Sequence, residues 1–171
     1  GLLTYMALSE DAKNPEYQLA VKQAEREAER VKVLARSPAG IQSSGIALLR
    51  ADAFTKGPKL FAEKCASCHR YDGHDGMGKM PTDPQSASDL KGFASRDWLT
   101  GLLDPERVST TNYFGATKFA AGKMVKFVKK DVANYAPEQK EKLKKIIAAL
   151  SAEAQLTSQL VVDQEHSALI E

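Results

Sequence analysis

The sequence predicts an all-α protein. Helix-start signals recur along the chain, apolar residues in two segments repeat at spacings of three and four, and no segment alternates as a half-buried strand does. The 171 residues are 43% hydrophobic and 27% charged, which excludes a disordered tail and a membrane bundle. No apolar run approaches the roughly 20 residues of a spanning helix. A net charge of +2 gives no reason to expect nucleic acid as a partner.

The first helix is expected from about residue 11 to residue 36. Asn14 can cap it, Pro15 is tolerated at the first helical position, and Glu16 favours the positive end of the helix dipole. Its apolar positions form a narrow seam of mostly small residues: Tyr17, Val21, Ala24, Ala28, Val31 and Ala35. Such a seam predicts a solvated helix that lies on the domain or crosses to a neighbour, not a coiled coil.

The middle of the chain predicts shorter elements. Weak helical signals between residues 41 and 55 precede an interruption at Gly57-Pro58, and a short helix over residues 59–64 follows. Residues 72–88 are rich in Gly, Pro, Asp and Ser, which indicates a loop. Ser95 is expected to cap a helix that ends before Asp104-Pro105.

A last strong helix is expected to start at Ala136-Pro137-Glu138. One face carries apolar residues and the other carries lysines; the apolar residues are Leu143, Ile146, Ile147 and Leu150. Residues 152–171 are expected to form a helical or disordered tail.

Both cysteines of the chain lie in one pentapeptide, Cys65-Ala66-Ser67-Cys68-His69. The pattern CxxCH is the signature of covalent haem attachment. Two thiols about one helical turn apart can add to the two vinyl groups on one edge of a porphyrin, and the adjacent imidazole can bind the iron. The motif therefore predicts one covalent haem c, with Cys65 and Cys68 as attachment points and His69 as proximal ligand.

Other metal chemistry fits these residues less well. A thioredoxin-like cysteine pair belongs in an α/β pattern, which the sequence lacks. Zinc could formally be bound by Cys65, Cys68, His69 and His74, but structural zinc sites usually draw a second ligand pair from farther along the chain. The loop over residues 72–79 lacks the closing acidic residue of a calcium site.

The second axial ligand is expected to be Met124, because a methionine sulfur opposite histidine suits electron transfer. Met124 lies far enough beyond His69 for the chain to travel around the ring. Met80 is a weaker candidate, and His74 or His166 would each give a bis-histidine centre. Met6 and Met77 are interpreted as packing residues.

The segment from Leu60-Phe61 through the CxxCH motif resembles the start of monohaem cytochrome c domains of class I. Residues 89–99 resemble a segment found after this motif in such domains when they are attached to cytochrome bc complexes. The resemblance covers about residues 45–151 and implies three main helices around one haem, with Leu90, Phe93 and Trp98 lining the pocket. This chain has Ser88 where the family often has a proline whose carbonyl accepts the proximal imidazole N–H, and Val125 where proline usually follows the ligand methionine.

The resemblance divides the chain into three parts. Residues 1–44 form a helical linker that resembles the end of a cytochrome b-type membrane subunit, residues 45–151 form the cytochrome c domain, and residues 152–171 form the tail. This implies electron transfer on the periplasmic side of a bacterial membrane, with membrane anchoring through a missing N-terminal segment. The alternative is a haem enzyme or sensor, such as a peroxidase, with an open or labile distal site.

The charge distribution is uneven. Residues 111–150 carry a net charge of +6, so the rest of the chain carries −4. The lysines of this segment flank Met124; they are Lys118, Lys123, Lys126, Lys129, Lys130, Lys140, Lys142, Lys144 and Lys145. Such a face would attract an acidic redox protein.

Overall fold

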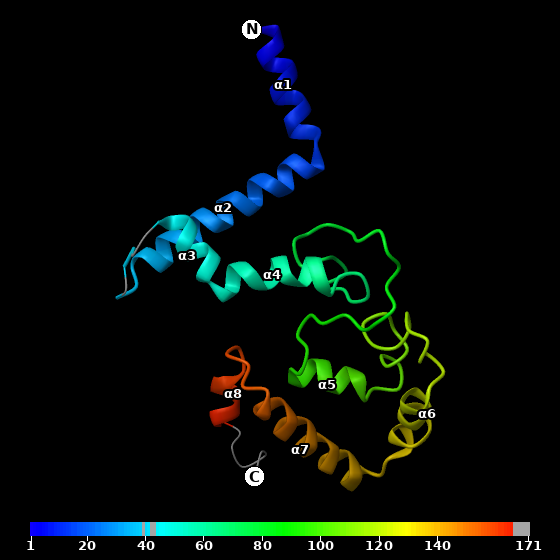
Figure 1. The fold of residues 1–171 in the computed structure, drawn as a ribbon. Coiled ribbons are helices and arrows are strands. Elements are labelled where there is room, and N and C mark those ends of the chain that lie inside the picture. Colours follow the sequence, from blue (N-terminus) through cyan, green and yellow to red (C-terminus); the bar gives the residue numbers. More distant parts are fainter. Residues whose placement is uncertain (39, 42–43, 166–171) are drawn as a thin grey trace. The chain divides into compact units, whose positions relative to one another are not determined.

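A computed structural model describes residues 1–38, 40–41 and 44–165. These residues form eight α-helices, one 3-10 turn and no strand (Figure 1), which confirms the all-α class. The chain divides into two compact units. The first contains Gly1–Cys65 and His74–Met80, and the second contains Ala66–Gly73 and Pro81–Glu171. No helix within the described ranges is both long and apolar enough to cross a membrane.

The first unit begins with helices α1 (Leu2–Lys13) and α2 (Pro15–Ala35). The expected start of α2 is confirmed, because the Asn14 side chain accepts from the backbone N–H groups of Glu16 and Tyr17 at 3.0 and 3.1 Å. Neither helix has a fully buried residue. On α1 this leaves a set of large apolar side chains exposed: Leu2, Leu3, Tyr5, Met6 and Leu8.

Two further helices complete the first unit, α3 (Gly45–Ala51) and α4 (Ala53–Lys64). The expected interruption at Gly57-Pro58 is wrong, since α4 continues through Pro58. Proline at this position removes the hydrogen bond to the carbonyl four residues earlier and crowds that carbonyl, and the remaining contacts of α4 outweigh this cost. The N-terminus of α4 is strongly capped, because the Asp52 carboxylate accepts from both the backbone N–H and the hydroxyl of Thr55.

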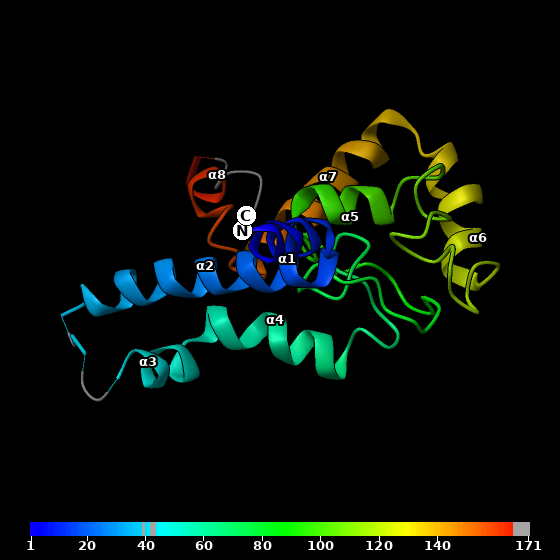
Figure 2. The same cartoon turned by 90° about the horizontal axis from the view of Figure 1, so that it is seen from above.

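Helices α2 and α4 lie side by side with opposite directions (Figures 1 and 2). Two ion pairs join them at 2.6–2.7 Å: Arg30 with Asp52, at the cap of α4, and Lys59 with Glu27. Lys79, in the loop that belongs to this unit, pairs with Glu16 at 3.2 Å. These ion pairs attach helix α2 to α4 and to the loop that contains Lys79.

The second unit contains α5 (Arg96–Leu102), α6 (Lys123–Lys130), the 3-10 turn η1 (Val132–Asn134), α7 (Pro137–Glu153) and α8 (Leu160–Glu165). Ser95 caps α5 as expected, accepting from the Trp98 N–H at 3.1 Å. Helices α5 and α7 lie side by side (Figures 1 and 2). The core of this unit is a valine cluster packed mainly around α6: Val108, Val125, Val128 and Val132.

The buried face of α7 differs from the expected one. Its buried residues are Ile147, Ala148 and Ser151, while Ile146 and Leu150 are each 52% exposed. The helical repeat of 3.6 residues explains the difference: positions 147, 148 and 151 face the rest of the unit, and positions 146 and 150 are turned toward its edge.

Candidate haem-binding site

The site is built around the His69 imidazole. His69 follows Cys68 directly, and its Nδ1 lies 2.8 Å from the Ser88 carbonyl oxygen. A carbonyl only accepts, so Nδ1 carries the proton in this hydrogen bond. In the neutral imidazole, Nε2 is then the nitrogen with a free lone pair, which is the tautomer that binds a metal ion.

The loop that supplies Ser88 is fixed at its far end by Asp89. This buried carboxylate accepts from the backbone N–H groups of Asp72, Gly73 and Lys91 at 2.7–3.0 Å. The Asp89 carbonyl accepts from Trp98 Nε1 at 3.2 Å. Asp89 therefore links the turn after the CxxCH segment to the first turn of α5.

An apolar cavity of about 200 Å³ lies beside this loop. Ser88, whose carbonyl holds His69, belongs to its lining. The remaining lining residues come from the loop, from α5 and from the segment before α6: Ser86, Ala87, Trp98, Leu102, Tyr113, Phe114, Thr117 and Phe119. Four aromatic side chains make this a suitable surface for a flat apolar ring.

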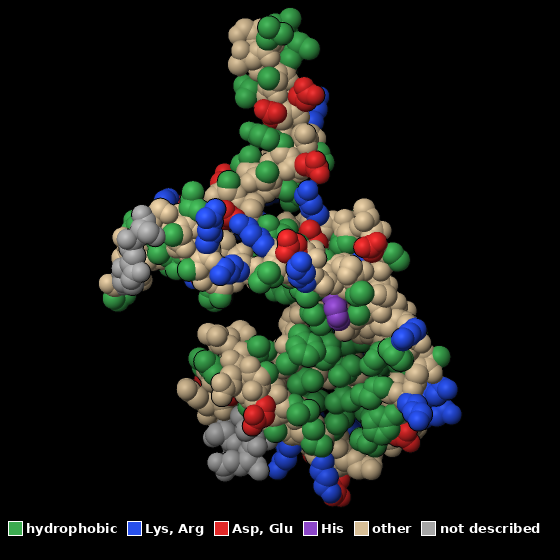
Figure 3. All heavy atoms as spheres, viewed as in Figure 1, with side chains coloured by type: hydrophobic (Ala, Val, Ile, Leu, Met, Phe, Trp, Pro, Cys, Tyr) green, Lys and Arg blue, Asp and Glu red, His purple; other side chains and the backbone are tan. Residues whose placement is uncertain are grey.

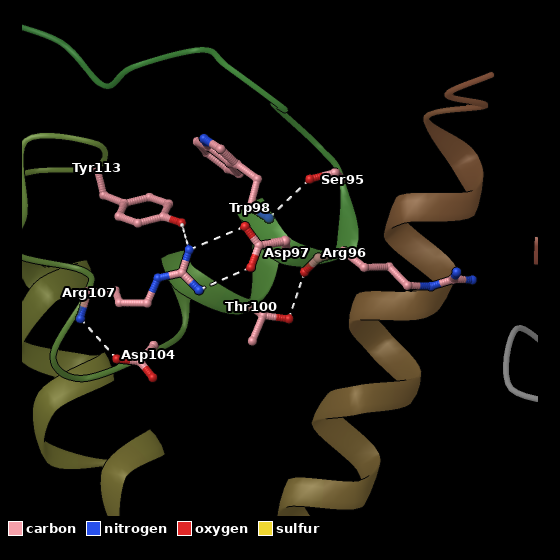
Figure 4. Close-up of polar contacts among 8 residues, drawn as sticks. All are labelled: Ser95, Arg96, Asp97, Trp98, Thr100, Asp104, Arg107 and Tyr113. Atoms are coloured by element: carbon pink, nitrogen blue, oxygen red, sulfur yellow. Dashed lines mark hydrogen bonds and ion pairs between the residues drawn. The ribbon is translucent and has the colours of Figure 1, made fainter. Parts of the chain in front are cut away.

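Trp98 and Tyr113 also line a second, polar cavity of about 520 Å³. Their rings are 5.4 Å apart. Arg107 fixes this wall (Figure 4), because its guanidinium contacts the Asp97 carboxylate at 3.2 and 3.4 Å and the Tyr113 hydroxyl at 3.3 Å. Gly101 makes the arrangement possible, since a Cβ there would lie 1.9 Å from the Tyr113 hydroxyl.

The electrostatics of this wall follow from the same contacts. The hydrogen bond to Asp97 raises the pKa of Arg107 above its ordinary value. Burial raises the pKa of the Tyr113 hydroxyl, although the Arg107 charge acts in the opposite direction. Arg107 therefore stays charged and Tyr113 stays neutral at physiological pH.

These residues fit a covalently attached porphyrin. Both cysteines are free of disulfide bonds, and His69 is in the ligand tautomer beside an aromatic cavity. A cavity of about 200 Å³ would take part of the ring. Figure 3 shows hydrophobic side chains gathered on the surface of the second unit between α5 and α6, and Phe119 in the cavity lining is itself 56% exposed. A larger apolar group therefore has further surface to cover.

The expected pocket residues lie in different positions. Trp98 lines both cavities. Phe93 is 54% exposed and packs edge-on against Trp98, with ring centroids 4.8 Å apart. Leu90 is half-buried, and its backbone N–H donates to the Arg70 carbonyl at 2.8 Å. Met124 is half-buried near the start of α6 and packs against the valine cluster. Its role as an iron ligand stays a prediction.

The other candidate ligands of the iron lie in the first unit or outside the described residues. Met80 is 77% exposed, Met6 lies on α1, and both belong to the first unit together with Met77 and His74. The Nδ1 atom of His74 accepts from the Gly76 N–H. His166 lies outside the described residues. Across the described ranges, no group of three or more His, Cys, Asp or Glu side chains could hold a metal ion.

Sequence reasoning did not single out several residues of the site. These residues are Leu102, Arg107, Tyr113, Phe114 and Phe119. The signal available was the concentration of aromatic residues in a Gly-containing segment without helical period. Arg70, next to the proximal histidine, gave no sequence signal of its role.

The fold and the site together define a small helical protein built to carry one covalently attached haem. A model of the family described as cytochrome c matches residues 54–151 of this chain. The chain belongs to the cytochrome c family. It therefore carries a covalently bound c-type haem and functions in haem-based electron transfer. Domains of this family are typically extracellular or periplasmic. No curated protein and no solved structure matched the chain.

Proposed function

We propose that the chain transfers electrons through a haem with His69 and Met124 as axial ligands, as part of a membrane respiratory complex of the cytochrome bc type. The observation that carries the ligation is the Ser88 carbonyl at 2.8 Å from His69 Nδ1, beside an aromatic cavity. When bound, the haem iron supplies a centre that alternates between the ferrous and ferric states.

The residues of this chain do the rest. Cys65 and Cys68 would hold the porphyrin through thioether bonds, and Ser88 would orient the His69 ring and increase its basicity. Trp98, Tyr113 and Phe114 would exclude water from one side of the ring. Arg107, which faces the polar cavity, would donate to the acidic groups of the porphyrin.

The distal ligand is tested by replacing Met124 with alanine in the haem-loaded protein. We expect loss of the weak long-wavelength absorption band of methionine-ligated ferric haem, the appearance of high-spin bands, and binding of cyanide or carbon monoxide. The Met80→Ala variant is the matched control, because Met80 is exposed, and should keep the original spectrum.

Two outcomes would contradict this assignment. An unchanged spectrum in Met124→Ala would remove Met124 as ligand. High-spin bands and ligand binding in the unmodified protein would instead favour a haem enzyme or sensor with an open distal site.

The membrane complex is supported by the surface of α1. Five of its large apolar residues are more than half exposed (Leu2, Leu3, Tyr5, Met6 and Leu8), which is typical of a surface covered by a partner. A cytochrome b-type membrane subunit on the periplasmic side would supply such cover. Co-purification of the haem protein with that subunit from detergent-solubilised membranes tests the association, and its absence would contradict it.

A further inference from the structure

Arg70, the residue after the proximal histidine, is 5% exposed. Its guanidinium donates from Nη1 to the carbonyls of Ala66 and His69 at 2.7 and 2.8 Å, and from Nη2 to the carbonyl of Asp83. No carboxylate among the described residues forms an ion pair with it. A buried cation satisfied by backbone carbonyls alone is expensive to desolvate, so its place calls for an explanation.

The three carbonyls belong to two separate segments. Ala66 and His69 lie in the haem-attachment segment, and Asp83 lies in the loop that leads to Ser88. Arg70 therefore joins the start of this loop, at Asp83, to the haem-attachment segment.

Backbone hydrogen bonds also attach the loop to the haem-attachment segment on both sides of Ser88. The Cys68 carbonyl accepts from the N–H groups of Ser86 and Ala87, both at 3.1 Å, and the Arg70 carbonyl accepts from Leu90 at 2.8 Å. The contact of Ser88 with His69 lies between these two attachments. The loop runs along the haem-attachment segment from residue 83 to residue 90.

We propose that Arg70 is a positioning residue for the proximal ligand: its guanidinium clamps the loop onto the attachment segment and so holds the Ser88 carbonyl on His69 Nδ1. The clamp supplies the restraint that a proline at position 88 would supply by fixing its backbone angle. This inference rests on the proposed ligation of the iron by His69.

The proposal can be tested by removing the Arg70 clamp and restoring the restraint with a proline at position 88. The Ser88 N–H donates no hydrogen bond within the described residues, so a proline there removes no backbone hydrogen bond. The variants are Arg70→Gln, Ser88→Pro and the double variant, all as haem-loaded protein. Arg50→Gln is the matched control, because Arg50 is exposed on α3 and its side chain forms no ion pair or hydrogen bond with a described residue.

The first measurement is hydrogen exchange of the His69 Nδ1 proton by NMR. We expect exchange to accelerate by about tenfold or more in Arg70→Gln, since the loss of one hydrogen bond is worth about that factor. The double variant should return toward the original rate, and Arg50→Gln should match the unmodified protein.

The second measurement is the reduction potential of Arg70→Gln against the double variant. Both lack the Arg70 charge, and the direct effect of replacing Ser88 is measured by Ser88→Pro against the unmodified protein, so the remaining difference reports the position of the carbonyl. A stronger Ser88 bond makes His69 a better donor to ferric iron, so the double variant should have the lower potential. If Arg70→Gln takes up no haem, the double variant should recover it.

Three results would overturn the proposal: exchange in Arg70→Gln equal to that of Arg50→Gln, no recovery in the double variant, or equal potentials of the two variants. Failure of the underlying ligation would be recognised separately. In that case the unmodified haem-loaded protein would show no imidazole proton shifted by the iron.

Discussion

Asp52 is a buried carboxylate that joins two helices of the first unit. It caps α4 through Thr55 and accepts from Arg30 Nη2 and Nε at 2.6 and 3.0 Å. The hydrogen bonds from Arg30 are the largest cause that lowers the Asp52 pKa from 3.8 to about 2. The folded state therefore binds this proton less readily than the unfolded chain does.

The lowered pKa predicts how stability depends on pH. The contribution of the Asp52 charge is fully present above about pH 4 and is lost as the pH falls from there through about 2. Asp52→Asn keeps a good capping side chain but removes the charge. We expect its urea midpoint to lie below that of the unmodified protein at pH 7, with the difference shrinking between pH 4 and pH 2.

The control for this prediction is Glu10→Gln, an exposed carboxylate of the same unit. It should show no comparable pH-dependent difference. A gap between Asp52→Asn and the unmodified protein that stays constant down to pH 2 would show that the charge contributes nothing.

At the scale of single residues, the sequence predicts chemistry that is local in the chain. Cys65, Cys68 and His69 are recognisable because their spacing alone defines the attachment chemistry. Arg70 and Arg107 are not recognisable, because their partners are carbonyls or side chains that folding brings together from other segments.

Helix α8 is attached to the rest of the second unit by Gln159, which immediately precedes it. The Gln159 amide accepts from the backbone N–H of Arg96, at the first position of α5, and donates to the Ser151 hydroxyl at 2.7 Å. Ser151 is fully buried. Arg96 adds an ion pair with Asp163 in α8, and Figure 4 shows its side chain pointing away from the Arg107 cluster.

Replacing Gln159 with alanine should therefore destabilise the protein. A buried hydroxyl and a helix N–H would each lose a partner, which costs about 1–3 kcal/mol. Urea unfolding followed by circular dichroism measures the change. Gln164→Ala is the matched control, because Gln164 lies exposed on α8 itself; equal stability of the two variants would contradict the role of Gln159.

The elements show which signals the sequence carries reliably. Asn14, Ser95 and Pro137 mark helix starts by local chemistry, and the structure confirms them. Helix α6 is not among the elements expected from the sequence, and its eight residues are too few to form a stable helix alone. It exists because Val125 and Val128 are buried in a cluster with residues on either side, which local sequence does not reveal.

For the whole molecule, the expected boundary at residue 45 stays a prediction. Helices α3 and α4 and Cys65 belong to the same compact unit as the N-terminal helices, whereas the family match begins at residue 54 and includes most of α4. Ion pairs such as Glu27 with Lys59 contribute to the difference, because they attach a helix outside the family match to a residue within it. Pairing between distant charges cannot be deduced from composition.

The surface charge of the second unit leads to a prediction about partners. Helix α6 buries Val125 and Val128 and exposes four lysines, none of which forms an ion pair with a described residue: Lys123, Lys126, Lys129 and Lys130. Lys118 lies over the ring of Phe119, which lines the apolar cavity, at 5.3 Å. Unpaired positive charge therefore lies on the unit that carries the aromatic cavity, where it would attract an acidic redox protein.

Reversing three of these charges tests the attraction. In Lys126→Glu/Lys129→Glu/Lys130→Glu we expect the second-order rate of electron transfer to an acidic redox protein to fall by about tenfold or more at low salt, because steering raises association rates by about 10–10³. The difference should shrink as ionic strength rises toward 0.5 M, since salt shortens the range of the attraction. The control reverses three exposed lysines of the first unit, Lys13, Lys22 and Lys56, and has the same net charge. Equal rates for the two triple variants would mean that only total charge matters, and α6 would then have no role in docking.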